Sequence, residues 1–167
     1  MRCCGLLLVG LLALTGCSCP DYDVASPPEF TLGFSTDTLA SGSVGFRRVE
    51  VRSAYLVRYV SPDLRQPLDT LRQLPAGVVT RPKLEIYYSS QGPPVVVLRE
   101  HRASPTVSVR SFRLAVPAAN RQFDITSLVR EQGTSGGRCP YPITIRNEAT
   151  VNGQRRDALQ QVPELTK

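Results

Sequence analysis

Apolar and polar residues alternate in several short runs along this chain. The clearest runs lie at 30–34, 49–59, 83–88 and 143–151, where apolar side chains occupy nearly every second position. Successive side chains of a β-strand point to opposite faces, so this alternation is typical of a strand with one buried face. A fifth run, Val95 to Leu98, is continuously apolar and predicts a short strand covered on both faces.

Turn-forming residues separate these runs. Asn152-Gly153 directly follows an alternating run, and this dipeptide is strongly associated with two-residue β-hairpins. The 14 prolines and 12 glycines lie mostly between the runs. The segment Asp124 to Glu131 carries the only helical signal, because Asp124 or Thr126 could cap a helix of one or two turns. The pattern therefore predicts a loop-rich protein built mainly of strands.

This organisation predicts an all-β fold. About seven or eight short strands, with a turn roughly every 8 to 15 residues, favour a single antiparallel, Ig-like β-sandwich. A small β-barrel is the alternative. The Trp that marks true immunoglobulin domains is absent, since the chain contains no Trp. The side chains that we expect in the core are Val49, Val51, Tyr55, Val57, Leu84, Ile86, Phe112, Leu114, Ile143 and Ile145.

The N-terminus follows a different pattern. A single charge, Arg2, precedes the uncharged and largely apolar residues Gly5 to Leu14. A membrane-spanning helix needs about 20 apolar residues, whereas this run has the length of the apolar part of a signal peptide. Leu14-Thr15-Gly16-Cys17 follows, with two small residues directly before a cysteine.

This order of features resembles the lipobox signal peptide of bacterial lipoproteins. The resemblance covers only residues 1–20, and Thr15 is a less usual choice than Ser or Ala. It implies that Cys17 takes a diacylglyceryl group and that cleavage before Cys17 makes it the first residue of the mature chain. Two or three acyl chains, as in that family, anchor a protein stably on a bilayer. An ordinary secretory signal with an incidental cysteine is the alternative.

The residue after the cysteine bears on localisation. In the lipoprotein family, an Asp at that place commonly retains the protein at the inner membrane. Ser18 occupies it here. The resemblance therefore implies a lipid-anchored protein of the bacterial outer membrane, facing the periplasm or the cell surface.

These observations divide the chain into four parts. Residues 1–16 form the signal peptide, and 17–28 form the lipidated N-terminus and a polar, Pro-rich tether. Residues 29–160 form the β-sandwich domain, and 161–167 form a C-terminal tail. The mature chain is one domain long and can bury a substantial core.

The cysteines provide one structural prediction. Of the five, Cys3 and Cys4 leave with the signal peptide and Cys17 is lipidated, which leaves Cys19 and Cys139. Disulfides persist in the oxidising compartments outside the cytoplasm, so we predict a Cys19–Cys139 bridge that contributes about 2–4 kcal/mol. Two unpaired thiols are the alternative. Two cysteines and a single histidine do not make up a set of zinc ligands, so we predict no metal site.

No segment carries a recognisable catalytic motif. The single histidine, His101, lies between charged residues, and the chain has neither a GxSxG nucleophile turn nor a phosphate-binding loop. The 14 acidic residues are scattered, so a facing carboxylate pair, and with it a small envelope hydrolase, stays open as a third hypothesis. We predict that the protein is not an enzyme and uses no cofactor.

The distribution of basic and aromatic residues bears on whether the ligand is a nucleic acid, a glycan or a protein. The net charge is +6, but the basic residues are spread and form no run longer than a pair, so we predict no nucleic-acid partner. Tyr87 and Tyr141 are the two weak candidates for stacking on sugars. The leading hypothesis is a non-enzymatic accessory, structural or protein-binding component of the envelope. A glycan-binding module is the alternative.

Overall fold

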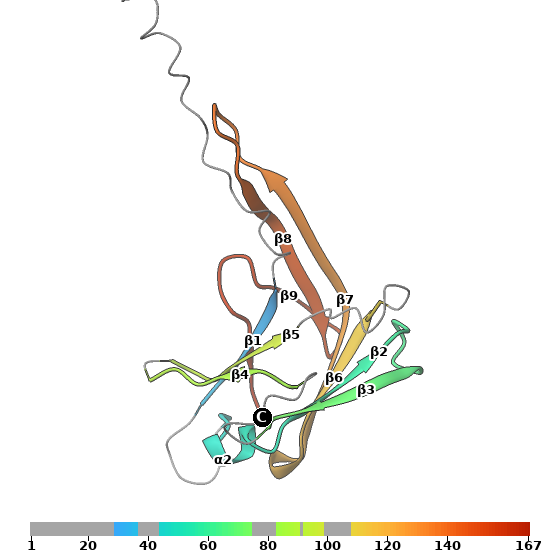
Figure 1. Cartoon of the computed structure of the whole chain (residues 1–167). Helices are drawn as coiled ribbons and strands as arrows, with labels where there is room; N and C mark the ends of the chain where they lie inside the picture. Colours follow the sequence, from blue (N-terminus) through green and yellow to red (C-terminus); the bar gives the residue numbers. More distant parts are fainter. Residues whose placement is uncertain (1–28, 37–43, 75–82, 91, 99–107) are drawn as a thin grey trace, which may run out of the picture.

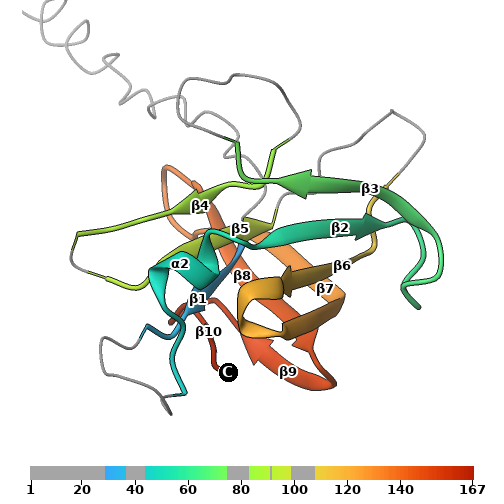
Figure 2. The ribbon, with the colours of Figure 1, turned by 90° about the horizontal axis from the view of Figure 1, so that it is seen from below.

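The computed structural model describes residues 29–36, 44–74, 83–90, 92–98 and 108–167. The chain forms two β-sheets that do not close into a barrel, so the fold is the predicted all-β sandwich (Figures 1 and 2). Neighbouring strands are antiparallel except for one parallel pair, β1 with β10. Within the described ranges, no helix is both long and apolar enough to cross a membrane.

The two sheets differ in size. The strands of the smaller sheet are, in spatial order, β10 (Glu164–Leu165), β1 (Phe30–Phe34), β5 (Val95–Leu98) and β4 (Ile86–Tyr87). Those of the larger sheet are β3 (Pro67–Arg72), β2 (Tyr55–Tyr59), β6 (Ser111–Val116), β7 (Arg121–Thr134), β8 (Pro142–Val151) and β9 (Gln154–Asp157). Two short helical segments, α2 (Arg48–Val51) and η2 (Pro117–Ala119), lie in the connections.

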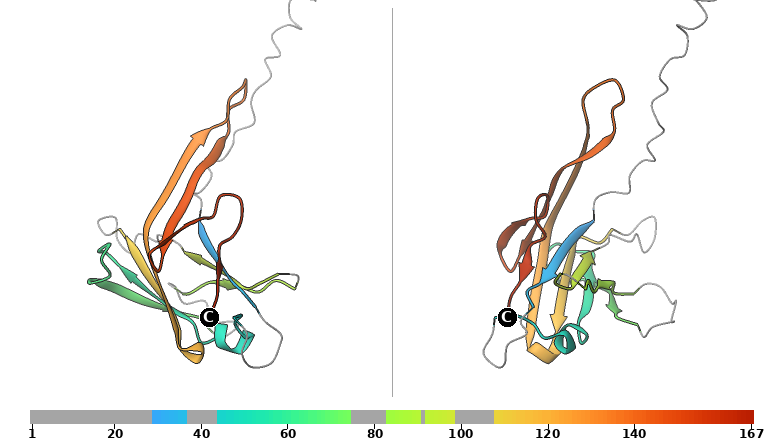
Figure 3. Two further views of the ribbon diagram at one scale, coloured as in Figure 1. Left: turned by 180° about the vertical axis from the view of Figure 1, so that it is seen from behind. Right: turned by 90° about the vertical axis from the view of Figure 1, so that its left-hand side faces the viewer.

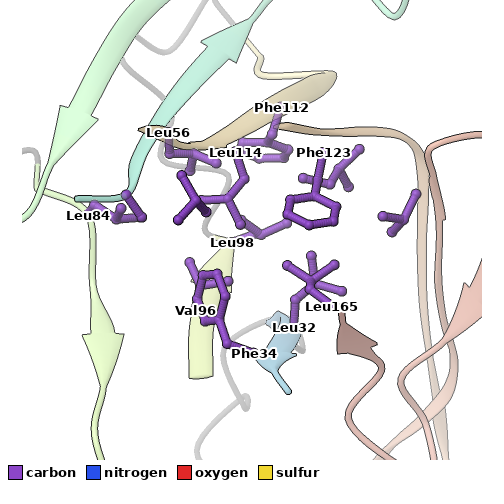
Figure 4. Close-up of a cluster of buried hydrophobic side chains, with 14 of the residues drawn as sticks. Leu32, Phe34, Leu56, Leu84, Val96, Leu98, Phe112, Leu114, Phe123 and Leu165 are labelled. Carbon is purple, nitrogen blue, oxygen red and sulfur yellow. The ribbon is translucent and has the colours of Figure 1, made fainter. Parts of the chain in front are cut away.

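The two sheets bury one hydrophobic core between them. The side chains that Figure 4 labels come from both layers: Leu56, Phe112, Leu114 and Phe123 from the larger sheet, and Leu32, Phe34, Val96, Leu98 and Leu165 from the smaller one, with Leu84 from the segment just before β4. Phe46 lies edge-on to two of these rings, with centroids 5.4 Å from Phe34 and 6.1 Å from Phe123. Each buried apolar side chain of this size contributes about 1.5–3 kcal/mol, so this contact is the main source of stability.

Several sequence predictions are confirmed. The alternating run at 30–34 is β1, and the continuous apolar run at 95–98 is β5. Asn152 and Gly153 join β8 to β9, with φ values of 48° and 80°. Both residues of a type I′ turn need positive φ, which explains why the Asn-Gly dipeptide marks the hairpin.

The segment before β2 is a helix and not part of a strand. Val51 is fully buried in the core, but Val49 is 67% exposed, so the prediction that both lie in the core is half wrong. Local hydrogen bonds explain the turn of helix: the backbone N–H of Arg47 donates to Glu50 Oε2 at 2.6 Å. Glu50, the third helical residue, thus accepts a hydrogen bond from the N-cap N–H group, which has no partner within the helix.

The face of β2 that enters the core is the opposite of the predicted one. Leu56 and Arg58 are buried, whereas Tyr55 and Val57 are half-buried on the other face. Arg58 is 2% exposed because it forms an ion pair with Asp69. The sequence pattern treats every arginine as solvent-facing, and a paired arginine violates that assumption.

The remaining core predictions have mixed outcomes. Leu84, Phe112 and Leu114 are buried, and Ile86 packs partly buried against the core. Ile143 is half-buried and Ile145 is 52% exposed, so the expectation for these two is wrong. Both lie in the part of β8 that extends beyond the sandwich.

The predicted helical turn at 124–131 is also wrong, because the whole segment belongs to β7. Its backbone pairs with both β6 and β8. Ser127 has a φ of 51°, and the register with β8 shifts between Thr126 and Val129. A β-bulge at this point replaces the helix, since an extra residue in one strand lets the pairing continue on both sides.

The C-terminal residues belong to the sandwich and are not a tail. β10 pairs in parallel with β1, and Leu165 is 4% exposed in the core. Across the described ranges the structure has ten strands where the sequence predicted seven or eight. The difference is physical, because β4 and β10 have two residues each and a two-residue strand shows no periodicity.

Candidate functional site at the arm formed by β7 and β8

The hairpin of β7 and β8 extends past every other strand. These strands have 14 and 10 residues, and they pair from Ile125 with Val151 to Thr134 with Pro142. Figures 1 and 3 show the outer half of this hairpin standing away from the sandwich. We call residues 129–148 the arm, and residues 135–141 the tip of the arm.

An ion-pair network holds the base of the arm. Glu148 accepts hydrogen bonds from Arg146 and Arg155, and Arg146 Nη1 lies 3.5 Å from Glu131 Oε1. The two guanidinium groups, Arg155 first, hold the pKa of Glu148 below its usual value, and Glu148 in turn raises the pKa of Arg146. These charges join β7, β8 and β9 across three neighbouring strands.

A second contact ties the arm to the start of the described chain. The Asn147 side chain is 6% exposed, and its Nδ2 donates to the carbonyl oxygen of Glu29 at 3.3 Å. Glu29 directly precedes β1. The chain therefore enters the sandwich beside the base of the arm.

Backbone and side-chain hydrogen bonds close the tip. Ser135 N–H donates to the carbonyl of Tyr141 at 2.8 Å, and Tyr141 N–H donates to Ser135 Oγ at 2.9 Å. Between them lies Cys139, which is disulfide-bonded. The four other cysteines, Cys17 and Cys19 among them, lie outside the described residues. The structure thus places a disulfide at the outermost point of the arm.

One face of the arm carries a strip of apolar side chains, namely Tyr141, Ile143 and Ile145. They occupy every second position, and Tyr141 and Ile145 are 47% and 52% exposed. A Cβ at Gly133 would lie 3.2 Å from Ile145 Cγ2 and 3.9 Å from Ile143 Cγ1, so the two isoleucines share a face over this glycine. Within the described ranges, no strand of the smaller sheet lies over the outer half of the arm (Figures 1 and 3), and Tyr141 and Ile145 are exposed there.

The two candidate sugar-stacking residues are not brought together. Tyr87 lies in β4 of the smaller sheet, 53% exposed, with its hydroxyl donating to Glu85 Oε2 at 3.0 Å. Tyr141 lies at the tip of the arm, which Figures 1 and 3 show at the opposite end of the molecule from β4. They do not line one groove.

A basic groove lies at the other end of the same hairpin. Its volume is about 340 Å³, and the cations Arg121, Arg156 and Lys167 line it together with Glu164. Lys167 Nζ is 2.8 Å from Glu50 Oε2, and this contact lowers the pKa of Glu50. The groove can attract anions, but Lys167, one of its cations, is already paired with Glu50.

The described part of the chain contains neither a candidate metal site nor a histidine. No group of three or more His, Cys, Asp and Glu side chains there could hold a metal ion. His101 lies outside the described residues. Sequence reasoning selected Cys139 and Tyr141 but missed the arm, and the signal that could have found it is the length of the strand pattern on both sides of 135–141.

Comparison with known proteins adds no family assignment. No family model matches the sequence, and neither the search of curated proteins nor that of solved structures finds a significant similarity.

Proposed function

We propose that the protein is a bacterial lipoprotein, anchored in the outer membrane through a lipidated Cys17. In this proposal, the β-sandwich is a non-enzymatic accessory or protein-binding component of the cell envelope. The observation that carries the proposal is the disulfide at Cys139. Structural disulfides form and persist outside the cytoplasm, which agrees with the export that the signal-like N-terminus implies.

The count of cysteines supports a specific partner for Cys139. Signal cleavage removes Cys3 and Cys4, and the lipid occupies the thiol of Cys17. Cys19 is then the one thiol left for an intramolecular bridge. The contact of Asn147 with Glu29 supports this pairing, because it already brings the N-terminal part of the sandwich to the arm.

Several charged side chains of the sandwich are occupied in ion pairs with one another, which supports a binding role over a catalytic one. Arg58 with Asp69, and Arg113 with Asp124, form cross-strand pairs, and Glu148 is held by two arginines. Exposed apolar side chains on the arm offer contact area instead. This strip is the surface that we assign to contact with a partner.

Membrane fractionation of a lipidation variant tests the anchor. The full chain is expressed in a bacterium that processes lipoproteins, beside Cys17→Ser and the control Cys139→Ser. We expect wild type and Cys139→Ser in the membrane fraction, with an intact mass of the cleaved chain plus acyl groups. Cys17→Ser should be neither lipidated nor cleaved at that site. Normal maturation and membrane retention of Cys17→Ser would overturn the proposal.

Crosslinking of intact cells tests the accessory role. We expect one dominant envelope protein to be captured reproducibly by wild type and lost with Cys17→Ser. Capture of no protein by the correctly anchored wild type would contradict a protein-binding role.

A further inference from the structure

We propose that the tip of the arm and the apolar strip beside it lie against the head-group layer of a phospholipid bilayer, with Tyr141 and Ile145 as the principal contacts. The arm is then a second membrane attachment beside the lipid. This inference rests on the proposed function, because it requires a lipidated Cys17 and a Cys19–Cys139 bridge.

The reach of the chain brings the tip to the membrane. Cys19 follows Cys17 by two residue steps, which span at most about 7 Å. The Cα atoms of bridged cysteines lie about 5.5–6 Å apart. The Cα of Cys139 therefore lies within about 13 Å of the Cα of the lipidated residue, and each head-group layer is about 5–8 Å thick. A tip held this closely to an acylated cysteine contacts the bilayer surface.

The chemistry of the tip suits that surface. Tyr141 is 47% exposed, and tyrosine favours the membrane interface because its ring is apolar and its hydroxyl is polar. Arg138 is the one charged residue of the tip and is exposed. The guanidinium group of an exposed arginine can contact the phosphate groups of lipids at a bilayer surface.

The apolar strip continues this surface along the arm. Ile145 is 52% exposed although it lies on a strand, and Gly133 leaves the space in which its side chain lies. Ile143 fills the position between Ile145 and Tyr141. The strip therefore begins directly beside Cys139, the residue that the proposed bridge holds near the lipidated N-terminus. This position favours the bilayer over a partner protein located away from the membrane.

Single tryptophan reporters test the inference, because the chain has no Trp of its own. Tyr141→Trp places a reporter at the tip. Tyr87→Trp is the matched control, since Tyr87 is 53% exposed on β4. Both lipidated full-length proteins are reconstituted into vesicles of phosphatidylethanolamine and phosphatidylglycerol, with and without lipids that carry a quencher at the head group.

We expect the Tyr141→Trp emission to shift to the blue on vesicles and to be quenched several-fold more than that of Tyr87→Trp. Adding Ile145→Ser to Tyr141→Trp should reduce the quenching. Equal, weak quenching of both reporters in protein that is lipidated and vesicle-bound would overturn the inference and leave the anchor intact. Quenching of the Tyr141→Trp reporter that an envelope protein prevents, with none by lipid alone, would identify a protein as the occupant and also overturn it.

Intact mass and a non-reducing peptide map of the same samples separate the two proposals. A lipidated N-terminus and a Cys19–Cys139 peptide pair are the expected results. A chain without lipid, or a bridge to another cysteine, would overturn the proposed function and the inference together.

Discussion

Arg58 and Asp69 lie directly opposite each other on β2 and β3 and form a two-point ion pair. Arg58 Nε is 2.7 Å from Asp69 Oδ1, and Arg58 Nη2 donates to Oδ2. The Arg58 side chain is 2% exposed, whereas that of Asp69 is 31% exposed. The aspartate thus connects a fully buried cation to the surface, and its loss removes this two-point ion pair.

Asp69→Asn should destabilise the protein by about 3 kcal/mol, because a buried charge without its partner keeps its desolvation penalty. Urea denaturation measures the change. The control is Asp63→Asn, whose partner Arg65 is 85% exposed, and its effect on stability should be much smaller because exposed ion pairs contribute little. Equal effects of the two variants would contradict the buried role of Arg58.

Leu114→Ala and Ile145→Ala distinguish the core from the arm, although the alternating pattern places both residues inside. Leu114 is fully buried and Ile145 is 52% exposed. We expect a loss of about 2–5 kcal/mol for Leu114→Ala and less than about 1 kcal/mol for Ile145→Ala, by denaturant midpoint. A comparable loss for both would show that the strip on the arm is covered in the folded chain.

Gly153→Ala should destabilise the hairpin of β8 and β9 by about 1 kcal/mol, because an alanine is strained at positive φ. Gly153 has a φ of 80° at the second position of the turn. Gly136→Ala is the control, since a Cβ there meets open space. Thermal melts of the two variants should differ, and identical melting temperatures would speak against the type I′ turn.

Cys139→Ser should lower the stability by about 2–4 kcal/mol, because the bridge restricts the unfolded chain. Wild type treated with reductant should melt like the untreated variant. Intact mass supplies an independent check, since reduction of one disulfide adds two hydrogens. A melting temperature that does not respond to reductant would contradict a stabilising bridge.

Acid should weaken the base of the arm. Hydrogen bonds from Arg155 and Arg146 lower the pKa of Glu148 from its ordinary 4.5, so the unfolded chain binds a proton there more readily than the folded one. The stabilisation is fully present above pH 4.5 and is lost as the pH falls through the lower folded value.

Glu148→Gln and Arg155→Gln test this dependence, because each removes one side of the contact. Urea midpoints are recorded between neutral pH and about pH 3, where carboxylates of this type titrate. Both variants should lose less stability on acidification than wild type. If the urea midpoints of both variants fall with pH as steeply as those of wild type, Glu148 is not the source of the acid sensitivity.

The sequence pattern predicts strands well where burial is governed by apolar side chains alone. Phe30, Leu32 and Phe34 alternate into the core, and Asn152-Gly153 forms the turn that its backbone preferences require. The pattern fails at β2, because Arg58 is buried by a carboxylate that lies eleven residues further along the chain. Periodicity contains no information on such a pairing.

At the candidate site too, the sequence predicts some features, whereas others depend on the tertiary structure. The count of cysteines singles out Cys139 without any knowledge of the fold. The arm depends on whether a second sheet covers the strand, and the alternation of Ile143 with Ile145 is the same in either case. The sequence therefore singled out Cys139, which is disulfide-bonded, but assigned the isoleucines of the arm to the wrong environment.

The length of the arm sets a distance. From Val129 to Thr134 the strands add about 20 Å beyond the sandwich, at about 3.4 Å per residue. Because a hydrogen-bonded hairpin bends far less than a single-stranded linker, it keeps the tip at a nearly fixed distance from the sandwich. The groove lined by Arg121 and Lys167 lies at the opposite end of the hairpin, so its separation from the disulfide-bonded tip stays nearly constant.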